Sequence, residues 1–311
     1  MSPVGFLRAT ADLRRLGEDP AGRDASGARH WVRVRHGVVA RAAVWQELRP
    51  EQRHAALVRA TAMQMRGETL PTFSHASAAA LWGLPRISSF PARVDVSMTG
   101  SGVRSSGLVR RHVAEVADPV MVDGLPTTTV PRTVVDLARM GALADAVAAA
   151  DHALHHGLCV RAELAAELER VALWARGRAR AALVLRLADA GAMSAGESLS
   201  RVQMFRLNLP RPWLQVEVRD VDGLVGYCDF GWEGVMGEFD GRRKYGLSAA
   251  RPDEVEQALW REKQREDRIR RRGHRMARWV WLDAVHPERM ARILATQGIR
   301  PTARNSWFDA A

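Results

Sequence analysis

Carboxylates crowd into one short stretch of the chain, GYCDFGWEGVMGEFDGRRKYG, which spans residues 226–246. Asp229 lies in one apolar-flanked run, and Glu238 and Asp240 lie in a second run beyond a glycine-bounded turn. If the two runs pair as a β-hairpin, Asp229 lies beside the other two acids, and the like charges raise one another's pKa values. Such a cluster is unfavourable unless a cation compensates it.

A divalent metal ion is the obvious compensating cation. Oxygen ligands suit Mg²⁺ or Mn²⁺, and either ion can polarise a phosphate and activate a water molecule. Lys244, four residues after Asp240, could bring its amine towards the metal and a scissile phosphate. The alternative is a structural network of ion pairs, in which Asp229 pairs with Arg242 or Arg243. In that case Asp240 serves only in the turn that ends a strand.

A fourth carboxylate, Glu197, precedes the hairpin in the segment SAGESLSRVQMFRLNLP. Ser194 and Glu197 have the S-x-x-E spacing of a capping box, and the apolar residues that follow recur at helical intervals. Glu197 is therefore either the capping glutamate of a helix or a member of the site.

The elements that position these acids follow from the periodicity of the flanking segments. WLQVEV, at residues 213–218, alternates as a half-buried strand, and the two runs of the hairpin continue the sheet. A helix of mixed charge then enters at residue 252 and ends at Gly273, before a strand at residues 276–282. The arginine-rich end of this helix is either a solvated face or a contact for a phosphate backbone.

This order of elements, with D-x(8)-E-x-D on adjacent strands, resembles the PD-(D/E)XK nuclease fold. More narrowly, the segments GESLSR, YCDF, GEFDGRRKY and REKQREDRIRRRGHRMARWVW are similar to the small domains related to the very-short-patch repair endonuclease. The resemblance covers residues 192–296. It implies that Asp229 and Glu238 bind the metal ion, and that Glu197 is a secondary metal ligand or orients water.

The chain departs from the general nuclease motif at one position. Asp240 stands two residues after Glu238, where the superfamily commonly has a catalytic lysine, and Lys244 is the candidate substitute. The expected metal ligands are Asp229, Glu238 and Asp240. The expected catalytic residues are these three with Lys244 and Glu197, and the expected DNA contacts at this site are Arg242 and Arg243.

The N-terminal half has a resemblance of its own. The run HWVRVRHGVVARAAVW predicts a β-hairpin that turns near His36, and SHASAAALWGLP predicts a helix that starts at a serine cap. These segments and DGLPTTTVPRTVVDLAR are similar to antitoxin-like proteins of the AbiEi type, which regulate transcription in type IV toxin–antitoxin systems. Their N-terminal winged helix binds DNA, which makes Arg33 and Arg35 candidates for phosphate contacts. A solvated strand face is the alternative.

Composition supports an anionic partner. Of 311 residues, 46 are Lys or Arg and 35 are Asp or Glu, which gives a formal charge of +11 and favours nucleic acid. Only two of the basic residues are lysines, as expected from a GC-rich coding sequence, so the abundance of arginine alone is weak evidence for binding. Cys159 and Cys228 predict neither disulfide nor structural zinc, and no run approaches the ~18 apolar residues of a membrane span. We expect a cytoplasmic protein.

The predicted fold class is α/β. A mostly helical N-terminal half contains a small winged-helix-like or β-hairpin element, and a restriction-endonuclease-like αβββαβ domain follows. We expect a degenerate winged-helix-like region at residues 1–70, an antitoxin-like region at 71–190 and the nuclease-like domain at 191–311, because small residues at 189–194 mark a boundary.

Three functions fit this organisation. The first is a Mg²⁺-dependent endodeoxyribonuclease that is linked to an antitoxin-like regulatory region. The second is a non-catalytic DNA-binding regulator or antitoxin with an inactive nuclease-like domain. The third is a protein that binds a cognate toxin through its alanine-rich middle. No acidic or cysteine partner at metal-ligand spacing accompanies His112, His152, His155 or His156.

Overall fold

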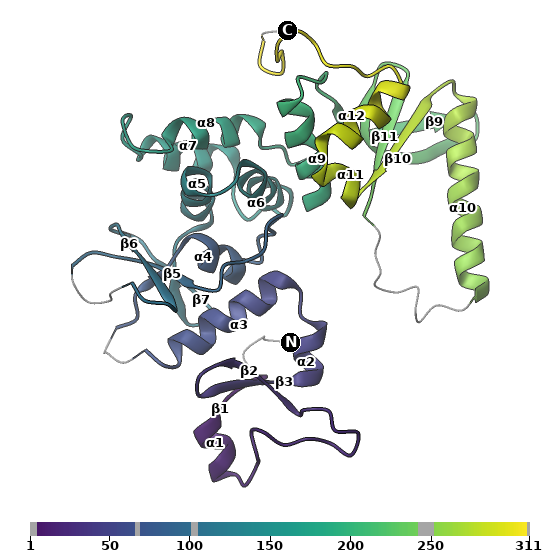
Figure 1. Cartoon of the computed structure of the whole chain (residues 1–311). Helices are drawn as coiled ribbons and strands as arrows, with labels where there is room; N and C mark the ends of the chain where they lie inside the picture. Colours follow the sequence, from purple (N-terminus) through teal and green to yellow (C-terminus); the bar gives the residue numbers. More distant parts are fainter. Residues whose placement is uncertain (1–4, 66–68, 101–104, 242–251, 310–311) are drawn as a thin grey trace. The chain divides into compact units, whose positions relative to one another are not determined.

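The computed structural model describes residues 5–65, 69–100, 105–241 and 252–309 (Figure 1). Helices and mixed sheets alternate along the chain, which confirms the α/β class. The chain divides into two compact units, Met1–Arg186 and Leu187–Ala311, which are described separately below. Among the helices of the described residues, none combines the length and apolar character that crossing a membrane requires.

The first unit begins with a small antiparallel sheet in the order β1-β3-β2. Of the two forms expected here, the β-hairpin is present: β2 and β3 pair across a turn at Gly37, whose φ of 74° suits glycine. In the described part of this segment, one short helix, α1, precedes the hairpin, and two more follow it. The elements are β1 (Leu7–Ala9), α1 (Thr10–Arg15), β2 (Trp31–Arg35), β3 (Val38–Arg41), α2 (Ala42–Glu47) and α3 (Pro50–Ala62).

A five-stranded sheet in the order β6-β5-β4-β8-β7 and a group of alanine-rich helices complete this unit. Its strands are β4 (Thr72–Phe73), β5 (Val94–Met98), β6 (Val109–Val113), β7 (Val120–Val122) and β8 (Leu125–Thr127). Its helices are α4 (His75–Leu81), α5 (Val130–Met140), α6 (Leu143–His155), α7 (Arg161–Glu169) and α8 (Arg178–Leu187), the last of which reaches the boundary of the unit.

The expectation that a serine side chain caps α4 is wrong. Ser74 is the N-cap residue, but its side chain does not cap the helix; its hydroxyl instead contacts the ring of His75 and accepts from Ser97. Thr129, by contrast, caps α5 by accepting a hydrogen bond from the backbone N–H of Arg132.

The second unit has the predicted order of helix, three strands, helix and strand. Its sheet runs β12-β11-β10-β9, with β11 and β12 parallel and the other pairs antiparallel. The elements are α9 (Ala195–Arg206), β9 (Trp213–Asp220), β10 (Gly223–Trp232), β11 (Val235–Asp240), α10 (Pro252–Arg271), β12 (Arg275–Val280), α11 (Trp281–Val285) and α12 (Pro287–Thr296).

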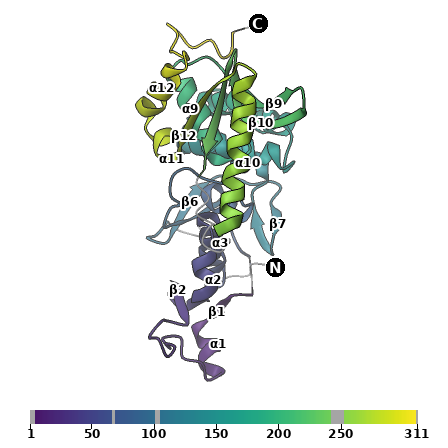
Figure 2. The same cartoon turned by 90° about the vertical axis from the view of Figure 1, so that its right-hand side faces the viewer.

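Helices cover both faces of this sheet (Figures 1 and 2). On one face Ile269 of α10 packs into a core with Val218, Cys228 and Met236 of the strands. On the other face lie α9, α11 and α12, and the indole N–H of Trp279 donates to the Ser200 hydroxyl of α9 at 2.8 Å. The sheet therefore holds α9 and α10, which both carry residues of the candidate site, on opposite sides.

Two local features at the end of the sheet matter for the site. Gly196 of α9 packs directly on the ring of Phe239 in β11, since a Cβ at this position would lie 2.0 Å from that ring. This close approach brings the start of α9 to the strands. The strand predicted at 276–282 ends earlier, at Val280, because the Asp283 carboxylate accepts the Val280 N–H at 3.2 Å and starts α11.

Candidate functional site

The predicted hairpin forms, and it brings Asp229 and Glu238 to the same end of the β10–β11 ladder. Phe230 pairs with Gly237 in the antiparallel ladder between β10 and β11. Asp229 and Glu238 are the residues immediately beyond that pair. Their carboxylates nevertheless have different partners, and this difference governs the chemistry available to the site.

Asp229 is stabilised by neutral dipoles alone among the contacts that the structure describes. Its carboxylate accepts the backbone N–H of Phe239 at 2.9 Å and interacts with the side-chain amide of Gln215. Burial raises the pKa of Asp229 to about 6, and the negative charges of Glu197 and, to a smaller extent, Glu238 add to the increase. A carboxyl group with this pKa can exchange protons near neutral pH.

Glu197 takes part in closing the start of α9, and its carboxylate also faces Gln215 and Asp229. Its N–H donates to the Ser194 hydroxyl at 3.2 Å, and its own carboxylate accepts the N–H of Met193 at 2.9 Å, so it helps to close the start of α9. The same carboxylate oxygen lies 3.4 Å from the Gln215 amide nitrogen and acts electrostatically on Asp229. Glu197 is buried, and it reaches the site as well as capping the helix.

Gln215 is a site residue that sequence reasoning missed. It sits in β9 with a φ of 47°, a left-handed conformation that is uncommon for a residue with a side chain. Its amide joins two carboxylates that come from different elements, Glu197 and Asp229. In the sequence it is simply one of the polar residues of an alternating strand, and no signal marks its backbone conformation.

Glu238 is held by two arginines that sequence reasoning also missed. Arg265 of α10 lies 2.6 Å from one carboxylate oxygen, and Arg278 of β12 lies 2.8 Å from the other. Both arginines also pair with Glu262 of α10. Burial lowers the pKa of each guanidinium, but the neighbouring carboxylates outweigh this and raise it. For Glu238 the structural network of ion pairs is therefore real.

Of the four other residues predicted for this site, the structure describes one. Asp240 is exposed at the end of β11. Lys244, Arg242 and Arg243 lie outside the described residues, so their expected roles stay predictions.

The carboxylate oxygens of the site are of the kind that Mg²⁺ prefers, but in the described residues they do not surround a common point. In the part of the chain that the structure describes, no group of three or more His, Cys, Asp or Glu residues lies in an arrangement for a metal ion. Two observations nevertheless suit a cation. Burial and then nearby negative charge raise the pKa of Asp229, a charge that a cation would offset, and the Glu238 carboxylate already attracts two cationic side chains. Asp229 and Glu238 could hold the ion if the arginines release Glu238.

A second group of predicted residues lies in the first unit, around the N-terminal hairpin. A cavity of about 610 Å³ opens there, and Arg33 and Arg35 both line it. Three more arginines share the lining: Arg14, Arg23 and Arg29. Arg35 also donates to the Thr61 hydroxyl of α3, and burial lowers its pKa, whereas Arg33 is exposed. The hairpin thus presents concentrated positive charge.

His112 has an acidic partner in the fold, although none stands at metal-ligand spacing in the sequence. The His112 ring contacts the buried Asp95 carboxylate at 2.9 Å, because β5 and β6 pair in parallel and bring the two residues together. Arg110 holds the same carboxylate at 2.6 Å, and its hydrogen bonds with those of His112 lower the pKa of Asp95 despite burial.

Comparisons with known proteins leave the family open. No protein-family model matches the chain, and no curated protein matches it. Among solved structures, the crystal structure of the RV2827C protein from Mycobacterium tuberculosis is similar over 58% of this chain and 71% of that chain. The identity is 18% and the TM-score is 0.33, which carries no argument about this chain.

The titration of Asp229 is the first testable consequence. In a carboxyl-carbon NMR titration of the full chain, Asp229 should titrate near pH 6, and Glu197→Gln should lower this pKa because it removes the largest neighbouring negative charge. Glu233→Gln, in the exposed turn of the same hairpin, is the matched control and should leave it unchanged. A value near the ordinary ~3.9 in the parent would contradict the account.

The same shift sets a direction for stability. The pKa of Asp229 is higher in the folded state than its unfolded value of about 3.9. Its contribution to the free energy of unfolding is therefore fully present below that value and is lost as the pH rises through about 6. Asp229→Asn should remove this part of the pH dependence in denaturant unfolding.

Proposed function

We propose that residues 187–311 form a metal-dependent phosphodiesterase domain that cleaves DNA, and that residues 1–186 form an antitoxin-like regulatory region. The observation that carries the proposal is the group of Glu197, Gln215 and Asp229, which come from a helix and two strands. Burial and the charge of Glu197 raise the pKa of Asp229 to about 6, while the Gln215 amide stabilises its carboxylate. Strongly perturbed carboxyl groups of this kind are enriched at catalytic sites.

Each residue has a distinct part in this proposal. Asp229 and Glu238 hold Mg²⁺ or Mn²⁺, and the bound ion supplies Lewis-acid stabilisation of phosphate charge and lowers the pKa of a water molecule. Glu197 and Gln215 orient water or ligands around Asp229. Asp240 and Lys244, with Arg242 and Arg243, remain the proposed further members on the sequence pattern alone.

The arginines on Glu238 imply that metal and DNA bind together. An ion that takes the Glu238 carboxylate leaves Arg265 and Arg278 without that partner, which is unfavourable for charges that are mostly buried. A DNA phosphate can replace the carboxylate, since guanidinium groups bind both in the same forked geometry. The two guanidinium groups then stand in for the missing lysine of the nuclease motif.

Cleavage of DNA tests this proposal. The full chain should cut a labelled duplex or single strand with Mg²⁺ and not with EDTA. Asp229→Asn and Glu238→Gln should each lower the rate by at least ~100-fold, because each removes charge that holds the ion. Glu233→Gln is the matched control and should cut at the parental rate.

Two outcomes would contradict it. Cleavage that survives in Asp229→Asn combined with Glu238→Gln would show that the activity lies elsewhere. Absence of cleavage with every form of DNA and either metal would favour the second candidate function below.

The second candidate is a DNA-binding regulator or antitoxin in which the nuclease-like unit is a scaffold. It is favoured by the five arginines that line one cavity beside the N-terminal hairpin. Arginine groups of this kind bind phosphates and make affinity depend on salt. In this case a cognate toxin is the expected protein partner, in accordance with the antitoxin resemblance.

Duplex binding in EDTA tests this candidate. Arg29→Gln and Arg33→Gln should each weaken binding and reduce the slope of log K against log salt by about 1, because each phosphate contact contributes about that amount. Arg15→Gln, on α1 but outside the cavity lining, is the control. Unchanged affinity in the Arg29→Gln/Arg33→Gln double variant would rule out the cavity as a DNA site.

A further inference from the structure

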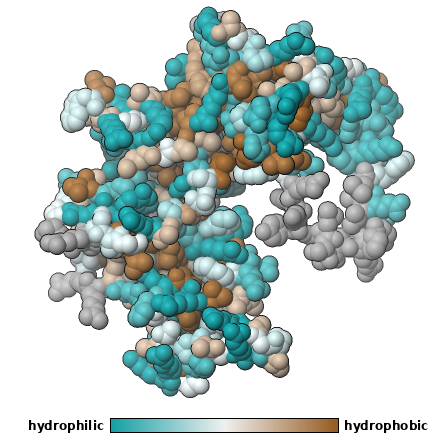
Figure 3. Space-filling view, viewed as in Figure 1, coloured by the Kyte–Doolittle hydropathy of each residue, from teal (hydrophilic) through white to brown (hydrophobic). Residues whose placement is uncertain are grey.

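The loop between α7 and α8 exposes two large apolar side chains to solvent. Leu173 is 81% exposed and Trp174 is 89% exposed. Figure 3 shows brown hydrophobic residues among teal hydrophilic ones over the face of the molecule in view. An indole buries a large apolar area when it is covered, so a tryptophan this exposed suggests a missing binding partner.

The backbone of this loop is fixed, so the exposure of Trp174 follows from how it is held. Arg178 spans the loop by donating to the Val171 carbonyl at 2.8 Å, and it pairs with Glu169 at 3.2 Å. Gly177 lies against α5 with a φ of 82°, where a Cβ would come within 2.4 Å of the Arg139 carbonyl oxygen. Arg180 donates to the carbonyl of Ala138 at 2.8 Å. These contacts hold the backbone of the loop that carries the indole.

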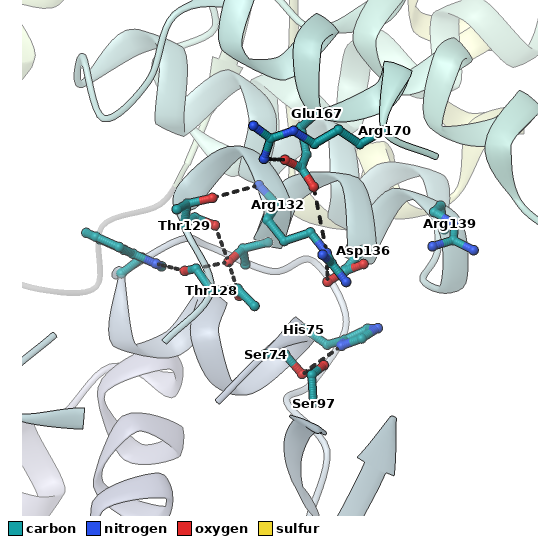
Figure 4. Close-up of polar contacts among 12 residues, drawn as sticks. Ser74, His75, Ser97, Thr128, Thr129, Arg132, Asp136, Arg139, Glu167 and Arg170 are labelled. Atoms are coloured by element: carbon teal, nitrogen blue, oxygen red, sulfur yellow. Dashed lines mark hydrogen bonds and ion pairs between the residues drawn. The ribbon is translucent and has the colours of Figure 1, made fainter. Parts of the chain in front are cut away.

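A polar cavity of about 420 Å³ adjoins the loop, within the size range of small-ligand sites. Its lining includes residues on both sides of the exposed side chains: Arg170, Val171, Ala172 and Ala175. In Figure 4 the Arg132 guanidinium lies between Asp136, at 2.9 Å, and Glu167, at 3.8 Å, while Arg170 donates to Glu167 at 3.3 Å. Arg132 is therefore neutralised by acids in the wall.

Positive charge is concentrated on the loop side of this cavity. Residues 170–180 contain four arginines and no acidic residue. Arg170 and Arg176 are exposed, and Arg139 of α5 lines the cavity and donates to the Arg176 carbonyl at 3.3 Å. The exposed acids of the lining, Glu115 and Asp118, belong to a different segment and would repel phosphate.

We propose that the α7–α8 loop and its cavity form a binding site for single-stranded nucleic acid. A base stacks on the Trp174 indole, and the phosphates lie against Arg139, Arg170 and Arg176. An exposed aromatic side chain among arginines suits this ligand, because every base has a face to stack and the backbone supplies the negative charge. A protein partner would be expected to use Leu173 as well as Trp174.

Fluorescence anisotropy with a labelled oligothymidylate of about 12 nucleotides tests the site. The full chain is used in EDTA, so the readout is binding alone and does not depend on the proposed cleavage. Trp174→Ala should weaken binding about tenfold or more, Trp174→Phe should keep most of the affinity, and Leu173→Ala should bind like the parent. Arg170→Gln/Arg176→Gln should reduce the salt slope by about 1.4, since each contact to a single strand contributes about 0.7.

Several results would overturn the inference. They are an absence of oligonucleotide binding by the parent, parental affinity in Trp174→Ala, and equal losses in Leu173→Ala and Trp174→Ala, the last of which indicates an apolar protein contact. Circular dichroism of each variant distinguishes a lost contact from a lost fold.

Discussion

The ion pairs of Glu238 with Arg265 and Arg278 are the interaction on which the second unit depends. They join β11 to α10 and to β12 around a carboxylate whose side chain is only 14% exposed. A carboxylate buried to this extent is strongly unfavourable without a cation, so the two guanidinium groups help to determine how α10 lies against the sheet. The same oxygens are those that a metal ion would need. Side chains thus neutralise this carboxylate, and the proposed metal ion would have to displace them.

Asp229 has the opposite electrostatics at the neighbouring position of the hairpin. Burial, and then the negative charges of Glu197 and Glu238, raise its pKa, while a peptide N–H and the Gln215 amide stabilise its charge. Two adjacent acids thereby acquire different properties: one is a paired anion, and the other is a carboxyl group that gains and loses a proton near pH 6. This difference arises from the side chains and backbone groups that the surrounding elements bring to each acid.

Local pattern was enough to predict the order of elements and the position of the hairpin. Alternation marked β9, the S-x-x-E spacing marked the start of α9, and the glycines marked the turn between β10 and β11. The partners of Glu238 were not predictable, because the rotation of α10 about its axis and the register of β12 decide which arginines reach it. The φ of Gln215 has no local signal. Burial of large apolar residues is the ordinary expectation, so the exposure of Trp174 could be recognised only in the folded chain.

The central claim is that Glu238 exchanges arginine for metal when a phosphate is present. Isothermal titration of Mg²⁺ into the parent chain, with and without a non-cleavable DNA duplex, tests it most directly. We expect saturable Mg²⁺ binding that is markedly tighter with the duplex and that is lost in the Asp229→Asn/Glu238→Gln variant. Mg²⁺ binding of equal strength in the parent and in this variant, in the presence of the duplex, would contradict the account.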